Sequence, residues 1–145
     1  MPSAQAVLSS LIESFNTHNK ELFLSLAAPG ATWWISGSPN TSTSTNHTVN
    51  IPHVGLIPYT SHPSFTGPTK LAQSSVTARE VIVDESQRKV VAECVFEGVG
   101  GGVWEGKGGF RMDVVLIVEL DDEGRILAVR NYADHLALVE FYAKS

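Results

Sequence analysis

The sequence has 145 residues, of which 43% are hydrophobic and 17% charged, and its formal net charge is −5 at pH 7. This length and composition indicate one globular domain over residues 1–145 and exclude a disordered chain. The acidic balance argues against a nucleic-acid partner, because phosphate binding needs clustered Lys and Arg. No apolar run reaches the roughly 18 residues of a membrane helix, and no secretory signal opens the chain, so we expect a cytoplasmic protein.

Apolar residues at helical spacing open the chain. A first helix is predicted over residues 4–18, with Ser3 as its N-cap and five apolar side chains on one stripe: Val7, Leu8, Leu11, Ile12 and Phe15. A second, shorter helix is predicted around Phe23, and Pro29 and Gly30 are expected to end it.

The next part of the chain has the period of a strand and then loses regular patterning. Residues 31–35 are β-branched and aromatic, which predicts a first strand, and residues 36–50 form a polar loop of low complexity. Residues 51–65 combine apolar side chains with three prolines, so we predict an irregular segment that packs on the body as a lid. A short helix is predicted after Pro68.

Strands and turns fill the second half. The pattern predicts strands over residues 79–83, 89–97 and 110–120 and a last strand that begins after Gly124. A short C-terminal helix follows, capped by Asp134. These elements predict the α+β class, with a strongly curved, mostly antiparallel sheet wrapped around the N-terminal helices.

The order of these elements resembles the NTF2-like superfamily, and within it the SnoaL-like and ketosteroid-isomerase-like proteins. The residues that carry the resemblance are the segment ATWWISGSP at 31–39, the DEGRI turn at 122–126 and the RNYADH ending at 130–135. The resemblance implies a cone-shaped domain with a deep apolar pocket between sheet and helices, usually as a homodimer. Enzymes of this kind isomerise, cyclise, dehydrate or hydrolyse small hydrophobic molecules, generally without a cofactor.

The catalytic residues of ketosteroid isomerase are not carried over. By the resemblance, its oxyanion tyrosine falls at Leu11, its general-base aspartate at Ile35 and its protonated aspartate at Leu116, all of which are apolar here. Classical 3-oxosteroid isomerisation needs a base beside the acidic carbon and acids beside the carbonyl, so we do not expect it.

The same alignment predicts which strand faces line the pocket. Residues 112, 114 and 116 and residues 129, 131 and 133 would point inward, and the charged Arg111, Asp113 and Glu119 would point outward. A register shift by one residue would instead make Arg111 and Asp113 the pocket charges. The predicted substrate-binding residues are Trp33, Ile35, Tyr59, Met112, Val114 and Leu116.

Three polar residues are the candidate catalytic groups, and each has a second interpretation. Asn131 can orient a substrate carbonyl or hydroxyl, or it can satisfy a neighbouring backbone group. Asp134 can act as a general acid or base, or it can cap the last helix. His53 can carry a proton near neutral pH, or it can be a solvated loop residue.

The other reactive residues suggest no further site. His47 and His62 are expected in loops and His135 on the surface, and five histidines without ligand spacing predict no metal site. The single cysteine, Cys94, lies on an apolar strand face and is expected to be inert core.

Two functional hypotheses follow. The first is a cofactor-independent isomerase or cyclase type of enzyme that uses acid–base chemistry on a small, hydrophobic, polycyclic secondary-metabolite intermediate. The second is a non-catalytic dimeric domain that binds a small molecule or a protein. An acid–base pair inside a closed pocket would favour the enzyme, and a pocket lined only by apolar residues would favour the binding domain.

Overall fold

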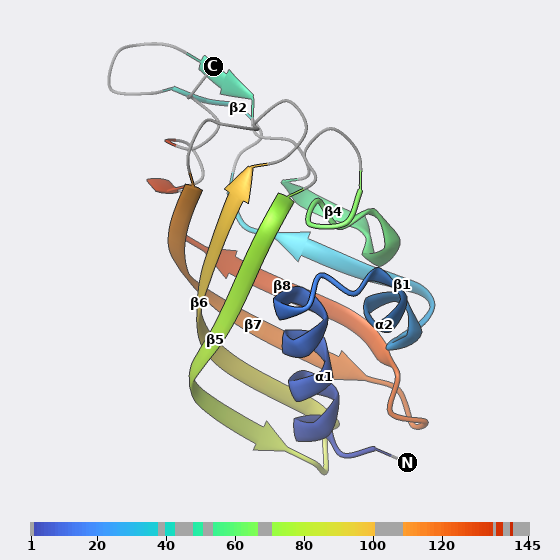
Figure 1. Cartoon of the computed structure of the whole chain (residues 1–145). Helices are drawn as coiled ribbons and strands as arrows, with labels where there is room; N and C mark the ends of the chain where they lie inside the picture. The colour runs from blue at the N-terminus through green and yellow to red at the C-terminus, as the bar shows by residue number, and fades with distance from the viewer. Residues whose placement is uncertain are drawn as a thin grey trace.

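The computed structural model describes residues 2–37, 40–42, 48–50, 54–66, 71–100, 109–134, 136–137 and 140 (Figure 1). Two helices open the chain, α1 (Ala4–Asn16) and α2 (Lys20–Ser25). The strands are β1 (Ala27–Ile35), β2 (Asn40–Ser42), β3 (Thr48–Asn50), β4 (Gly55–Pro58), β5 (Leu71–Asp84), β6 (Lys89–Gly100), β7 (Gly109–Leu120) and β8 (Ile126–Ala133). A 3₁₀ turn, η1 (Tyr59–Ser61), follows β4.

Six strands form one sheet in the order β4-β1-β8-β7-β6-β5, and β2 pairs with β3 separately. Only the β1–β8 pair of the large sheet is parallel. The sheet curves strongly around α1 and α2, which lie on its concave side (Figure 1). The predicted α+β class and the curved, mostly antiparallel sheet are therefore confirmed.

The first helix is capped from two directions. The Ser3 hydroxyl accepts a hydrogen bond from Ala6 N at 3.1 Å, as predicted. A carboxylate oxygen of Glu85, in the β5–β6 turn, accepts from Ala4 N at 2.9 Å and adds a negative charge at the positive end of the helix. The start of the chain is thus tied to a turn some eighty residues away.

The end of α1 covers the free edge of β5. Asn16 Nδ2 donates to Val76 O at 3.1 Å, and Val76 N donates to Asn16 Oδ1 at 2.6 Å, so one side-chain amide pairs like a neighbouring strand. Ser74 Oγ donates to Phe15 O on the same edge. These bonds satisfy backbone groups that an uncovered edge strand would present to other chains.

Three predictions of local structure are wrong. The predicted helix after Pro68 is instead the start of β5, where Leu71 pairs with Gly100 of β6. The stretch predicted as a polar loop contains the β2–β3 hairpin. The first strand begins at Ala27, and Pro29 and Gly30 lie within it at a register shift against β8. In each case, pairing with another strand overrides the local signal.

The predicted lid is partly regular, because β4 pairs with β1 along the sheet edge and η1 follows directly. The C-terminal helix is described at Leu136, Ala137 and Glu140, which are helical as predicted. No helix among the described residues is long and apolar enough to cross a membrane.

Candidate functional site

The concave face of the sheet carries a single row in which Asn131 stands between apolar residues. Asn131 of β8 is paired in register with Ile35 of β1 on one side and with Leu116 of β7 on the other. All three are buried, with Asn131 9% exposed. In the adjacent row, Trp33 and Val129 are 1% exposed. The sequence pattern therefore places one amide in an apolar wall.

The predicted facing of the strands is confirmed. Met112, Val114 and Leu116 of β7 are buried in the core cluster, whereas Arg111 and Asp113 are exposed. The alternative register, with Arg111 and Asp113 as pocket charges, is wrong. Alternation of apolar and charged residues decides the facing, because a shift by one residue would bury both charges.

A cluster of aromatic rings packs against Trp33. The Phe15 ring makes edge contacts with Phe23 and Trp33, with centroids 5.6 and 6.0 Å apart. His62 joins this cluster with its ring edge-on to Trp33 at 4.5 Å, and the side chain is only 5% exposed. Its Nδ1 accepts a hydrogen bond from Ser64 N at 3.1 Å.

His62 lies outside the helices and strands, as expected, but it directly follows η1 and is buried in the core. The available signal in the sequence was its position between two aromatic residues, Tyr59 and Phe65, which are also buried. A histidine in such a segment follows its apolar neighbours into the interior.

Tyr59, predicted to bind substrate, has a hydroxyl that is already engaged. Its Oη donates to Phe23 O at 2.7 Å, and its ring stacks on Phe23 with centroids 4.2 Å apart. Burial raises the pKa of the Tyr59 phenol. The structure thus shows Tyr59 anchoring η1 to α2.

Buried polar atoms without a hydrogen-bond partner occur on the concave face. Among the described residues, the buried side-chain atoms without a hydrogen-bond partner include Asn131 Oδ1, Trp33 Nε1 and Ser64 Oγ. Most buried polar atoms in proteins are paired, and an unpaired one costs free energy, so each calls for an explanation. A bound molecule that supplies the missing partners is such an explanation.

The other two candidate catalytic residues do not join this row in the described structure. Asp134 is exposed, and its Oδ1 accepts from Ala137 N at 3.3 Å, which is the helix-capping geometry of its second interpretation. His53 lies outside the described residues, as do His47 and His135.

Several carboxylates of the described strands lie on the convex face, where they pair with cations. Arg79 contacts both Glu93 and Asp113, and Arg111 lies 3.7 Å from Glu97. No described carboxylate is buried, and no group of three His, Cys, Asp or Glu among these residues could hold a metal ion. The polar atoms of the described concave face are thus neutral amide, indole, imidazole and hydroxyl groups.

Cys94 is fully buried, and burial raises the pKa of its thiol from 9.0 to about 11. The folded state therefore holds this proton more tightly than the unfolded state. The resulting stabilisation is complete below about pH 9 and is lost as the pH rises toward 11.

We expect the urea concentration at the unfolding midpoint to decrease as the pH is raised from 9 to 11. The total loss of unfolding free energy should reach about 2–3 kcal/mol. Urea titrations at several pH values measure this, and Cys94→Ala should have a flatter profile between pH 9 and pH 10. Iodoacetamide should alkylate Cys94 much more slowly in the folded protein than in urea at pH 8. Equal alkylation rates in the two conditions would contradict the burial of the thiol.

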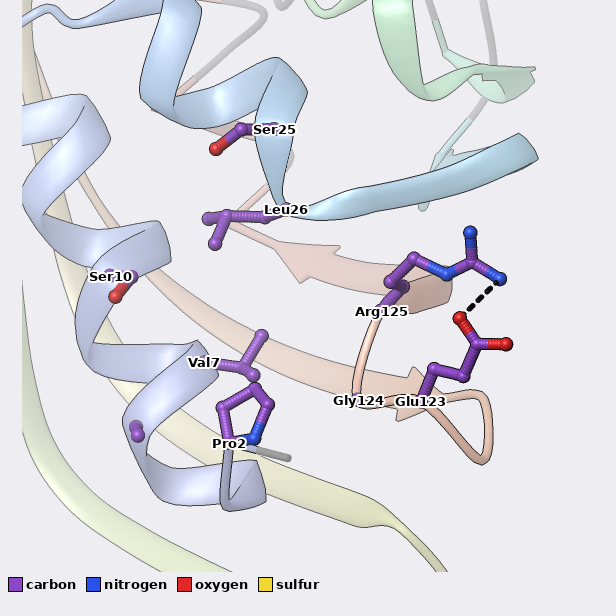
Figure 2. Close-up of a pocket in the computed structure, with 9 residues that line it drawn as sticks. Pro2, Val7, Ser10, Ser25, Leu26, Glu123, Gly124 and Arg125 are labelled. Atoms are coloured by element: carbon purple, nitrogen blue, oxygen red, sulfur yellow. Dashed lines mark ion pairs between the residues drawn. The ribbon is translucent and has the colours of Figure 1, made fainter.

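Two surface pockets formed by described residues lie away from this row. One, of about 300 Å³, is bounded by the N-terminal half of α1, the end of α2 and the β7–β8 turn (Figure 2). Its charged groups are already compensated, because Arg125 lies 3.3 Å from Glu123 and 3.0 Å from Asp121. None of its lining residues carries one of the unpartnered buried atoms found among the described residues.

The second pocket, of about 400 Å³, is a groove on the convex face lined by Trp34, Leu56 and Tyr132 together with neighbouring residues of β1, β7 and β8. Leu56 is 68% exposed and Tyr132 46% exposed. Dimerisation, which the family resemblance implies, would require a face of this kind and stays a prediction.

Comparison with known proteins defines the fold. A scan against protein-family models finds no match, and neither does a search of curated proteins. Among solved structures, PrhC from Penicillium brasilianum NBRC 6234 superposes with a TM-score of 0.71 at 10% identity, covering 97% of this chain and 86% of PrhC.

Two further solved structures carry the names of enzymes. An LEH-like epoxide hydrolase of M. tuberculosis has a TM-score of 0.66 at 14% identity and covers 97% of this chain and 90% of its own. The BvnE pinacolase from Penicillium brevicompactum has a TM-score of 0.68 at 14% identity, and the superposition covers 94% of this chain and 86% of the pinacolase chain. At these identities the likeness concerns the fold alone. The chain therefore has the NTF2-like fold that its sequence resembles.

Proposed function

We propose that this protein is an enzyme of the isomerase or cyclase type that acts without a cofactor on a small, hydrophobic, oxygen-bearing molecule. The observation that carries the proposal is the buried Asn131 amide, whose Oδ1 has no partner within an otherwise apolar row. Ligand sites of this kind combine apolar walls with a few polar groups that orient the bound molecule. In this proposal Asn131 holds the substrate oxygen while the walls exclude water.

The similar structures support an enzymatic role, since two of them are named as an epoxide hydrolase and a pinacolase. The finer proposal, a polycyclic secondary-metabolite intermediate as substrate, rests on the family resemblance and on the apolar walls formed by Ile35, Met112, Val114 and Leu116.

Proton transfer is assigned to His53, because a histidine changes its protonation near neutral pH and this residue lies in the predicted lid. Asp134 is left out of the mechanism, since its carboxylate is exposed and bonded to Ala137 N. Asn131 then fixes the reacting oxygen, and His53 moves the proton.

A panel of cyclic epoxides, 1,2-diols and β,γ-unsaturated ketones, analysed by mass spectrometry after incubation, tests the proposal. We expect conversion of at least one class, and we expect His53→Ala to reduce its rate about 100-fold or more. His47→Ala, a histidine substitution in the preceding polar stretch, is the control and should leave the rate unchanged.

One observation favours the second candidate function, a non-catalytic binding domain. No carboxylate of the described residues is buried on the concave face. If every member of the panel is recovered chemically unchanged while some members bind, the binding domain is the better description and the enzymatic proposal fails.

A further inference from the structure

We infer that the molecule bound at this site presents a hydroxyl group, as an alcohol or enol, to Asn131 and Trp33. The inference rests on the proposed site and names the chemical class of its ligand. It starts from two buried atoms without partners, Asn131 Oδ1 and Trp33 Nε1. An amide oxygen only accepts hydrogen bonds, and an indole N–H only donates them.

The two side chains occupy adjacent rows of the same sheet face. Trp33 is paired with Val129, and Ile35, two residues further along β1, is paired with Asn131. Strand geometry then sets the Trp33 and Asn131 backbones about 8 Å apart on the diagonal. Both side chains point into the core, with exposed fractions of 1% and 9%. In this inference, one small group lies between these two side chains, in contact with both.

No described side chain or backbone group completes these hydrogen bonds. Ile35, Leu116 and Val129 flank the two polar side chains with purely apolar groups. The Trp33 ring is packed against Phe15 and against His62, with centroids 6.0 and 4.5 Å away, so its orientation is set by its neighbours. Among the described residues these two atoms are left without partners, and a bound molecule can supply them.

A hydroxyl group on the bound molecule satisfies both atoms, because it donates one hydrogen bond and accepts others. A ketone or an ether can accept from Trp33 Nε1 but leaves Asn131 Oδ1 unpaired. A hydrocarbon leaves both unpaired. Since an unpaired buried acceptor costs about 1–3 kcal/mol, a matched alcohol should bind at least about fivefold more tightly than the ether or ketone.

Three probes isolate the donated hydrogen bond: cyclohexanol, methoxycyclohexane and cyclohexanone, titrated into ¹⁵N-labelled protein and followed by NMR. The Trp33 indole N–H signal, assigned through its loss in Trp33→Phe, reports occupancy of the site. We expect cyclohexanol to bind at least about fivefold more tightly than either other probe and to shift the Trp33 indole signal.

Two variants attribute that preference to the correct residue. Asn131→Leu should bring the three dissociation constants to within about twofold of one another, with the fold checked by circular dichroism. Arg130→Leu, the neighbouring position whose side chain is exposed, should keep the preference for cyclohexanol.

Equal binding of the three probes to the wild-type protein would overturn the inference, as would the absence of any Trp33 indole shift with cyclohexanol. Either result leaves the conversion assay intact as an independent test of the enzymatic proposal. A preference for cyclohexanol that survives Asn131→Leu would also overturn it, because the acceptor would then lie elsewhere.

Discussion

Replacing Asn131 by leucine is expected to make the protein more stable and less active at the same time. Asn131 Oδ1 is buried without a partner, and such an acceptor costs about 1–3 kcal/mol relative to a satisfied one. Leucine has the same branched arrangement of side-chain heavy atoms and no polar atom to desolvate, so we expect the free energy of unfolding to rise by about 1 kcal/mol. Functional sites commonly hold residues that the folded state alone would not favour.

The same substitution should lower turnover on the order of 100-fold, because the substrate oxygen loses the group that orients it. Urea denaturation and the conversion assay measure the two effects on the same preparation. The control is Arg130→Leu, the adjacent residue with an exposed side chain, which should change the stability by less than about 0.5 kcal/mol and leave turnover unchanged.

Asn131 would instead have a structural role if the leucine variant were destabilised by more than about 1 kcal/mol. The amide would then be satisfied in the folded protein, and its removal would cost a hydrogen bond. Increased stability together with full activity would also contradict the proposal, since it would separate the unpartnered oxygen from catalysis.

Replacing Phe15 by alanine is expected to produce the largest loss of stability, about 3–5 kcal/mol, because it empties the centre of the aromatic cluster. Phe15 is 2% exposed, and its ring lies within 6.0 Å of the ring centroids of Phe23, Trp33 and His62. In a protein of this size such a loss lowers the melting temperature by roughly 10–15 °C. Thermal and urea denaturation measure it.

Leu24→Ala in α2 is the matched control, since Leu24 is 36% exposed and its truncation should cost less than about 1 kcal/mol. A Phe15→Ala loss as small as that of the control would mean that the cluster collapses around the missing ring. The variant also bears on function, because Phe15 packs against Trp33, which belongs to the proposed ligand contact.

Several features of the fold could be predicted from local patterns. The helical stripe of α1 predicted a buried face, and Val7, Leu8, Leu11 and Phe15 are buried. The family alignment predicted that Leu116 and Asn131 face inward and that Asp113 faces outward, and the alternating burial along β7 and β8 in the structure agrees. These predictions succeed because the period of burial is a property of one segment and needs no knowledge of its partner.

Other features depend on residues far apart in the chain. The stretch after Pro68 could not be predicted as a strand, because Leu71 is held in β5 by its pairing with Gly100. The pairing of Asn16 with Val76 and the capping of Ala4 by Glu85 likewise join residues that only the folded chain brings together.

For the candidate site, the sequence and its family resemblance predicted that one amide, Asn131, stands in an apolar wall, because strand periodicity fixes the facing of a whole strand once one position is aligned. Only the tertiary structure decided what surrounds it. Folding buried His62, bonded the Tyr59 hydroxyl to Phe23, exposed Asp134 and left Asn131 Oδ1 and Trp33 Nε1 without partners. The physical reason is that hydrogen-bond satisfaction is decided by three-dimensional neighbours, which a local pattern does not contain.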